Sequence, residues 1–275
     1  MQAVCIGPAV DTLTAAAGEV HSVFVRAANL TVGDRLWTLL GRAQGDLPCG
    51  IRLDLETLEA LWLRRGEPVH IRAGYLSFSA RTAPLVVDCR AVPRWSPGAV
   101  GPLIPGLKDR LAFLSTEAEP KAWQGSAAMA AAVMNCLRHD PARLKPVLAS
   151  IIGSGPGLTP AGDDVLVGIL AVLTTPAAGP AGAAAAGAIG GALASFLPAT
   201  TFVSRHLLHQ AGGGMFARPV VDLVSALIGG SMGAALDAAA LRLVAIGATS
   251  GADTCMGILA GCESFLVDDD MQEAA

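Results

Sequence analysis

One stretch limits the folds open to this chain more than any other: no charged residue occurs between Asp164 and Arg205. An uncharged stretch of this length could cross a bilayer as a helix. However, Pro176, Pro180 and Pro198 divide it, and it is mostly Ala and Gly rather than the Leu, Ile, Phe and Val that drive insertion. We therefore expect closely packed helices of a soluble domain with no membrane partner, and we keep a membrane-associated protein as the less favoured alternative.

Charge is scarce throughout the second half of the chain. Such scarcity predicts helices that are buried on nearly every side, some of them against another chain. Assembly into a homo-oligomer is therefore one of the alternatives. A buried carboxylate needs a metal, an arginine or backbone N–H groups as its partner, which makes each remaining charge informative. Between Ala149 and Cys262 the charged residues are Asp163, Asp164, Arg205, Arg218, Asp222, Asp237, Arg242 and Asp253.

Composition excludes several classes of protein. The net charge of −4 provides no broad basic surface, so nucleic acid is not an expected partner. The six cysteines are scattered without a CxxC pair or a Cys/His cluster, and we interpret them as reduced thiols. The first 20 residues have no basic region ahead of an apolar run, which is not the pattern of a signal peptide. We therefore expect a cytoplasmic protein.

The arrangement of apolar and polar residues along the chain predicts an α+β protein. It comprises a small antiparallel β-rich domain over 1–115, a helical domain over 116–265 and a disordered tail over 266–275. Alternation of apolar and polar residues or β-branched runs predict strands within 21–28, 50–55, 69–73, 76–79 and 84–92. The run 55–66 predicts a helix closed by Gly66. The segment 92–110 is rich in Pro and Gly, and we place the boundary between the domains near it. Apolar residues at helical spacing predict a helix after Ser126, its expected N-cap, that ends at Asp140.

A glycine-rich turn, GSGPGLTPAGDD, occupies residues 153–164. Its glycines permit backbone conformations that other residues avoid. Thr159 and Pro160 predict an N-cap and a first helical residue, so Asp163 and Asp164 should lie in the first turn of a helix. Such a loop offers free N–H groups and the positive end of a helix to an anion, while the carboxylates could hold Mg²⁺ or position a nitrogen nucleophile. The loop has no G-K-[ST] and is not a Walker A motif.

A second, shorter version of this turn, GATSGADTCMGILAG, occupies residues 247–261. Alignment on the shared Gly-Ile-Leu-Ala pairs Gly162 with Gly251, Asp164 with Asp253, and Gly168 with Gly257. A pseudo-twofold arrangement would bring two helix N-termini and three carboxylates to one pocket. The alternative is that both turns are helix caps with glycines needed only for packing. On the first interpretation the catalytic candidates are Asp163, Asp164 and Asp253, of which Asp163 and Asp164 are the metal candidates. The substrate-binding candidates are Gly153, Ser154, Gly155, Gly157, Thr159, Gly162, Thr249, Ser250 and Gly251.

Between the two turns, Ser204, Arg205 and His206 form a polar cluster in a region with few charges. Arginine can hold a carboxylate or phosphate through two hydrogen bonds, and we add these three residues to the substrate-binding candidates. An ordinary hydrogen-bonded histidine is the alternative for His206.

The run IGSGPGLTPAGDDVLVGILA, residues 152–171, resembles the AllH family of oxamate carbamoyltransferase subunits. The family pattern ends L-T-P-S-G-D-D, and Ala161 replaces the serine here. The resemblance extends to SVFVRAANL near the start, to SRHLLHQAGGG after Ser204, and to the second glycine turn, so it covers most of the chain.

The resemblance implies a subunit that acts with an FdrA-like protein and a further carbamoyltransferase subunit in allantoin and purine catabolism. It implies carbamoyl transfer between an oxamate-like acid and phosphate, and hence a small anionic substrate such as carbamoyl phosphate, phosphate or oxamate. It assigns no catalytic residues, so the site residues rest on the two glycine turns. The alternative is a non-catalytic scaffold or regulatory subunit of such a complex.

Overall fold

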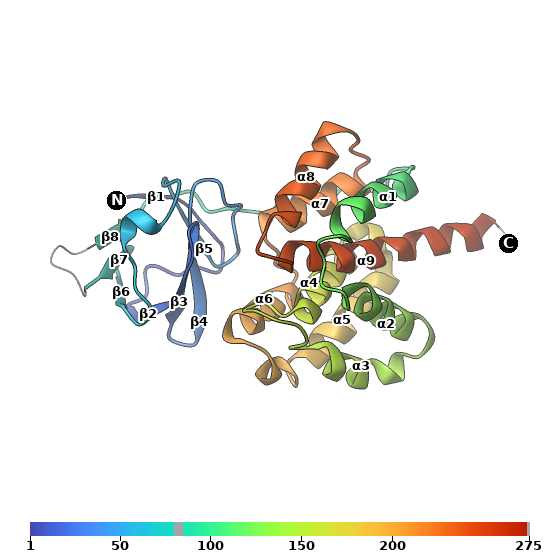
Figure 1. Cartoon of the computed structure of the whole chain (residues 1–275), viewed down its shortest axis with the longest axis horizontal. Helices are drawn as coiled ribbons and strands as arrows, with labels where there is room; N and C mark the ends of the chain where they lie inside the picture. The colour runs from blue at the N-terminus through green and yellow to red at the C-terminus, as the bar shows by residue number, and fades with distance from the viewer. Residues whose placement is uncertain (80–84, 274–275) are drawn as a thin grey trace. The chain divides into compact units, whose positions relative to one another are not determined.

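The computed structural model describes residues 1–79 and 85–273, with side chains through 266. The chain forms two compact units, Met1–Pro97 and Gly98–Ala275 (Figure 1). The division falls inside the Pro- and Gly-rich segment 92–110. The predicted boundary at residue 115 instead lies within the first helix of the second unit, α1 (Leu107–Ala118), because the helical unit begins earlier than its first apolar helical pattern.

The first unit is an eight-stranded sheet in the order β1-β5-β4-β3-β2-β6-β7-β8. All neighbouring strands are antiparallel except β4 and β5, which are parallel. Bridges from Gln2 to Asp88 and from Ile6 to Arg94 bring the two ends of the sheet together, so the sheet is nearly closed. Its strands are β1 (Ala3–Ile6), β2 (Ala16–Val23), β3 (Ala27–Val32), β4 (Arg35–Leu40), β5 (Gly50–Leu53), β6 (Pro68–Arg72), β7 (Tyr75–Phe78) and β8 (Leu85–Asp88).

Alternating burial explains these strands. In β6, Val69 and Ile71 are buried while their neighbours are exposed, as expected for a sheet with one face against the core. The run 21–28 is not one strand, because it contains the turn between β2 and β3. The run 84–92 supplies β8, and its first residue, Pro84, lies outside the described residues.

The predicted helix over 55–66 is wrong. This run forms only a short 3-10 turn at Glu59–Leu61, which ends where Trp62 takes a left-handed φ of 51°. Leu58, Leu61 and Leu63 are all buried, and this spacing does not fit one helical face. The segment instead lies along the sheet, where the Gly66 N–H donates to the Val20 carbonyl.

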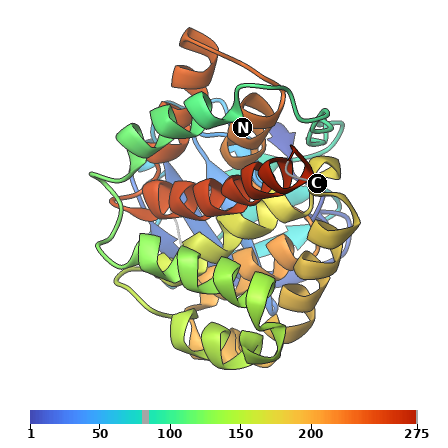
Figure 2. The same cartoon turned by 90° about the vertical axis from the view of Figure 1, so that its right-hand side faces the viewer.

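The second unit is helical, so the predicted α+β class is confirmed. Figure 2 shows α9 packed against α4, with α1 and α2 on either side of α9. α9 continues through Glu273, past the predicted start of a disordered tail at residue 266. After α1, the helices are α2 (Ser126–His139), α3 (Leu144–Ile151), α4 (Ala161–Leu173), α5 (Gly179–Leu193), α6 (Phe202–Gly212), α7 (Arg218–Ile228), α8 (Ala234–Val244) and α9 (Ser250–Glu273).

Glycines let α4 and α9 pack backbone against backbone. A Cβ on Gly168 would lie 2.1 Å from the Thr254 carbonyl oxygen, and a Cβ on Gly257 would lie 2.0 Å from the Val165 carbonyl oxygen. Gly261 packs on the Val172 side chain, one turn further along both helices. Because the register rises together, from 168 beside 257 to 172 beside 261, the two helices run parallel. Their N-termini therefore begin side by side.

In the described part of the chain, no single helix is long and apolar enough to span a membrane. The pair Ala161–Leu173 and Pro176–Leu193 passes such a test only jointly, and it bends by 76° at the break. The apolar character of α4 has a different use, because all but one of its residues are buried inside the helical unit. All six cysteines are buried.

Candidate functional site

The two glycine turns meet at the N-termini of α4 and α9. The hydroxyl oxygens of Thr159 and Ser250 lie 2.6 Å apart, although the residues are separated by 91 positions. Each helix start also packs on the end of the preceding helix. A Cβ on Gly162 would lie 2.1 Å from the Ile151 carbonyl oxygen, and one on Gly251 would lie 1.8 Å from the Leu243 carbonyl oxygen. The aligned glycines thus occupy equivalent places in two structural repeats.

The start of α4 lies one residue later than the sequence predicts. Pro160 is the N-cap, Ala161 is the first helical residue, and no side chain caps this helix. The Thr159 hydroxyl is therefore not a cap and contacts Ser250 instead. In the second turn Thr249 accepts, through its carbonyl, the backbone hydrogen bond of Asp253.

The loop before α4 contains three glycines with positive φ. Gly153, Gly155 and Gly157 alternate with other residues and have φ values of 77°, 112° and 93°. The loop is fixed where the Gly162 N–H donates to the Ser154 carbonyl at 2.9 Å. Among the described residues, the N–H groups of Gly155, Gly157 and Leu158 have no protein acceptor. Alternating backbone of this kind leaves N–H groups that can converge on an anion.

Asp163 is fully engaged by the protein. Its side chain is buried, and it accepts hydrogen bonds from the Gly153 N–H at 2.9 Å, from the Ser204 hydroxyl at 2.6 Å and from the Thr200 hydroxyl. These contacts tie the glycine loop and the start of α6 to α4. The geometry assigns Asp163 a role in positioning the loop, because both of its oxygens already have donors.

Asp253 is engaged on one oxygen only. Its Oδ1 accepts from the Trp123 N–H at 2.7 Å and from the Ser126 hydroxyl at 2.6 Å, which joins the start of α9 to the start of α2. Its Oδ2 is buried and has no hydrogen-bond partner. Ser126 is therefore not the N-cap of α2, where Gly125 stands; its hydroxyl serves Asp253 instead.

Like Asp253, Asp164 has one carboxylate oxygen without a hydrogen-bond partner. Its side chain is buried, and its Oδ2 has no hydrogen-bond partner. Burial raises the pKa of Asp164 well above its usual range, and the hydroxyls of Ser250 and Thr159 lower it only in part. The negative charges of Asp253 and Asp163 also raise this pKa, so the three carboxylates lie within electrostatic reach of one another.

Of the three candidate residues on α6, Ser204 contacts a site carboxylate, because its hydroxyl donates to Asp163. The Arg205 Nε donates to the Leu197 carbonyl at 3.2 Å, and the His206 Nδ1 lies 2.7 Å from the Phe202 carbonyl, with its ring centroid 4.4 Å from that of Phe202. These contacts of Arg205 and His206 do not involve the three carboxylates.

No group of three or more His, Cys, Asp or Glu side chains could hold a metal ion in the described part of the chain. Mg²⁺ commonly binds through one or two carboxylates and completes its shell with water and substrate phosphate. Magnesium at Asp163 and Asp164 therefore stays a prediction, and the oxygens of Asp163 already accept three hydrogen bonds.

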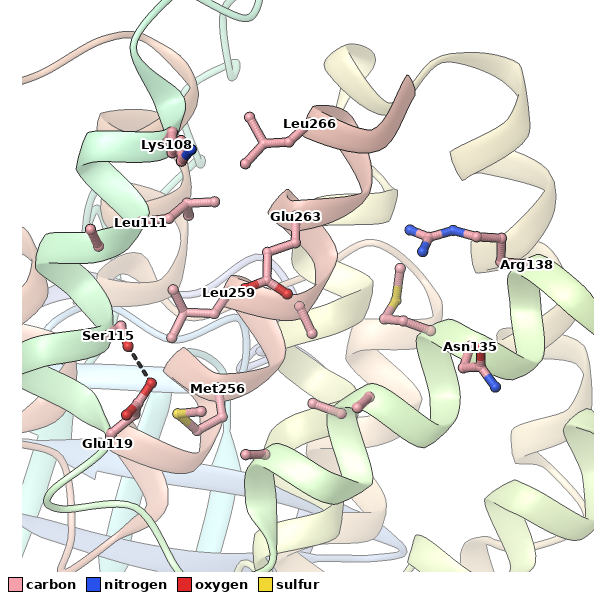
Figure 3. A pocket seen from close by; sticks show the side chains of 16 residues that line it. Lys108, Leu111, Ser115, Glu119, Asn135, Arg138, Met256, Leu259, Glu263 and Leu266 are labelled. Atoms are coloured by element: carbon pink, nitrogen blue, oxygen red, sulfur yellow. Dashed lines mark hydrogen bonds between the residues drawn. The ribbon is translucent and has the colours of Figure 1, made fainter. Parts of the chain in front are cut away.

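A separate cavity of about 680 Å³ lies between α1, α2 and α9 (Figure 3). Leu111, Met256 and Leu259 provide apolar walls, and Lys108 and Arg138 provide positive charge. None of the predicted site residues lines it. Sequence reasoning did not find this cavity, because its walls come from three helices that are distant in sequence and carry no shared motif.

Three residues that complete the carboxylate site were also missed: Trp123, Ser126 and Thr200. Each is an ordinary residue near a helix start, and each reaches its aspartate over a long sequence separation. The sequence around a helix start gives no local signal that a hydroxyl or N–H group donates to a carboxylate elsewhere in the chain.

The chain thus combines a β-rich unit with a helical unit that has buried carboxylates at paired helix N-termini. Residues 4–94 match the model of the AllH family N-terminal domain, and residues 151–262 match that of oxamate carbamoyltransferase subunit AllH. These matches cover more than half of the chain, so the chain belongs to the AllH family. The second match spans both glycine turns. No curated protein and no solved structure gives a significant match.

Proposed function

We propose that this chain is the substrate-binding subunit of a carbamoyltransferase complex and holds a small anion at the paired N-termini of α4 and α9. One observation carries the proposal: the two parallel helices start side by side, with the hydroxyls of Thr159 and Ser250 2.6 Å apart. Parallel helix dipoles add at this end and favour negative charge. The free N–H groups of the Gly155–Leu158 loop supply hydrogen-bond donors next to it.

The family description supports carbamoyl transfer as the reaction. In such a transfer, the carbamoyl carbon leaves the phosphate oxygen of carbamoyl phosphate and bonds to the nitrogen of an oxamate-like acid, which loses a proton. In its ionised form a carboxyl group of raised pKa is a stronger base and can accept that proton, and we assign this role to Asp164. Asp253, with its own unpaired oxygen, stands beside it. An FdrA-like subunit is the proposed partner that completes the enzyme.

Thermal unfolding of the purified chain with phosphate, carbamoyl phosphate or oxamate tests the site. A ligand at about 100 times its dissociation constant adds roughly 2.7 kcal/mol to the free energy of unfolding. Thr159→Val should reduce this stabilisation, whereas Thr174→Val, at the opposite end of α4, should leave it intact. The site is refuted if no anion stabilises the chain, or if both variants respond alike.

A scaffold subunit is the second candidate, and exposed apolar side chains near α8 favour it. Met232, Leu241 and Ile246 are 61%, 48% and 36% exposed. Exposed apolar residues that gather in one place commonly mark protein contacts. Asp164→Asn in the assembled complex separates the candidates. Loss of turnover with assembly retained supports the substrate-binding role, and loss of assembly in step with turnover supports the scaffold.

A further inference from the structure

The cavity between α1, α2 and α9 is an elongated groove (Figure 3). Its lining residues on α1 run from Lys108 to Glu119, and those on α2 run from Ala127 to Arg138. Each wall therefore extends about 16 Å along its helix, at a rise of about 1.5 Å per residue. A groove of this length matches a bound helix of about three turns, and amphipathic helices commonly bind in apolar grooves.

Small side chains leave room in this groove for a helix. Ala112 on the α1 wall is exposed, and so are Ala127 and Ala131 on the α2 wall. The floor between the walls is apolar, with Met256 and Leu259 of α9. Because small side chains reduce the distance between helix axes, a helix bound here can approach this floor closely.

The two ends of the groove differ in charge. Lys108 and Arg138 lie toward the C-terminal end of α9, whereas Glu119 lies toward its start (Figure 3). One negative side chain, Glu263 of α9, lies near the two cations. Among the described residues, neither Lys108 nor Arg138 forms an ion pair. The described lining side chains thus make one end positive and the other negative.

α8 has the length and the exposed face of a helix that fits this groove. It has 11 residues and is therefore also about 16 Å long. Leu236 and Leu243 are buried inside the unit, whereas Leu241 is 48% exposed. Ala234 and Ala238 share a face with Leu241 at helical spacing and keep this face narrow. Such an exposed apolar face commonly marks a protein contact.

α8 also carries charges that complement the groove. Asp237 lies one turn before Leu241, and Arg242 directly follows it. Among the described residues, Asp237 forms no ion pair, and the Arg242 Nη2 lies 4.0 Å from the Asp222 Oδ2. When Asp237 points to the positive end of the groove, Arg242 lies toward Glu119 at the negative end.

We propose that α8 of one copy of this chain binds in the groove of a second copy, with Leu241 against the apolar floor. Matching length, apolar surface and charge carry this proposal. α1 lines the groove and also packs on α8, so the two surfaces are neighbours on one unit. A two-fold dimer can therefore form the contact twice. The proposal goes beyond the proposed function and does not depend on the anion site.

Sedimentation velocity of the purified full-length chain, at concentrations up to about 100 μM, tests the proposal. We expect the wild-type chain to be dimeric. Ala131→Glu places a charge in the groove and Leu241→Glu places one on α8, so each should weaken self-association at least about 100-fold. Two exposed control residues lie outside the contact. Ala132→Glu, next to Ala131 on α2, and Leu13→Glu, in the first unit, should keep the dimer.

A mixture of the two variants gives the sharpest test. Ala131→Glu keeps an intact α8 and Leu241→Glu keeps an intact groove, so one α8–groove contact can still form between them. We therefore expect a heterodimer in the mixture, weaker than the wild-type dimer, although each variant alone is monomeric. A fluorescent label on one variant reports this heterodimer during sedimentation.

Several results would overturn the proposal. They are a wild-type chain that stays monomeric, a dimer that both variants retain, and loss of the dimer in either control. A dimer that both variants lose and that their mixture does not restore would also overturn it, because like surfaces would then be in contact. Circular dichroism establishes that each variant is folded. If one is not, Ala127→Glu in the same groove or Arg242→Glu on α8 takes its place.

Discussion

The two glycine turns are built from the same parts, but only the first has a long loop. Gly162 and Gly251 hold equivalent packing positions, as do Gly168 and Gly257. Nine positions separate Gly153 from Gly162, whereas four separate Gly247 from Gly251. What the turns share is therefore helix packing and a pair of aspartates, and what they do not share is the loop with unpaired N–H groups.

The aspartates also include a pair that both turns share and one residue that only the first turn has. Asp164 and Asp253 are equivalent by alignment, and each has a buried Oδ2 without a partner. Asp163 has no counterpart, because Ala252 stands at its place in the second turn. Asp163 binds the Gly153 N–H at the beginning of the long loop, so this additional carboxylate accompanies the additional loop. The two turns therefore share a pair of aspartates with one unpaired oxygen each, and only the first adds a loop of unpaired N–H groups.

The largest effects should come from the shared packing glycines. Gly168→Ala and Gly257→Ala each place a Cβ about 2 Å from a backbone oxygen of the other helix, so the helices must separate. We expect each change to lower the free energy of unfolding by about 3 kcal/mol, and by similar amounts because the contacts are reciprocal. Urea denaturation measures this.

Gly187→Ala is the control for these variants. Gly187 is an exposed residue inside α5 with open space where its Cβ would stand, so this change should raise stability by up to about 1 kcal/mol. If Gly168→Ala behaved like Gly187→Ala, the close parallel packing of α4 and α9 would be incorrect.

Asp164 should make the stability of the chain depend on pH. The pKa of Asp164 is raised in the folded chain, so the folded state holds a proton that the unfolded state releases above about pH 4. The stability contributed by this group is complete below that pH and is lost as pH rises towards the folded pKa. The free energy of unfolding should fall by up to about 1.4 kcal/mol per pH unit in that window.

Asp164→Asn should remove this part of the slope, because an amide does not titrate there. Asp109→Asn, at an exposed helix start, should keep it. Chemical denaturation at a series of pH values compares the three proteins. An unchanged slope in Asp164→Asn would show that Asp164 is ionised in the folded chain.

Local patterns in the sequence predict much of this arrangement. The paired glycines and aspartates can be aligned because a helix start needs the same residues wherever it occurs, and strands such as β6 follow from alternation of apolar and polar residues. The partners of the aspartates cannot be predicted this way. Ser126 lies 127 positions from Asp253, and only the packed fold brings them together.

Local patterns also fail where tertiary contacts override them. The run after Leu55 has helix-forming residues, yet burial of Leu58, Leu61 and Leu63 against the sheet requires an irregular path. At Thr159 the expected cap is displaced by a hydroxyl from the second turn, Ser250. Both cases show a side chain used for a distant contact in place of its local preference.

The smallest changes in stability should come from glycine substitutions in the two loops. Gly157 and Gly247 both have positive φ, of 93° and 66°. Replacement of either by Ala places a side chain in a strained conformation, and we expect each variant to lose about 1 to 2 kcal/mol of stability. Gly66→Ala, with a φ of 78° and open space around its Cβ, should cost a similar amount in the first unit.

The anion response should distinguish these variants where stability does not. Gly157 lies within the loop of unpaired N–H groups, so Gly157→Ala should weaken the stabilisation by oxamate in thermal unfolding. Gly247→Ala and Gly66→Ala should retain it, since neither changes that loop. If Gly157→Ala kept the full response, the donors for the anion would have to come from the helix starts that both turns share, and the long loop would serve only to place Asp163.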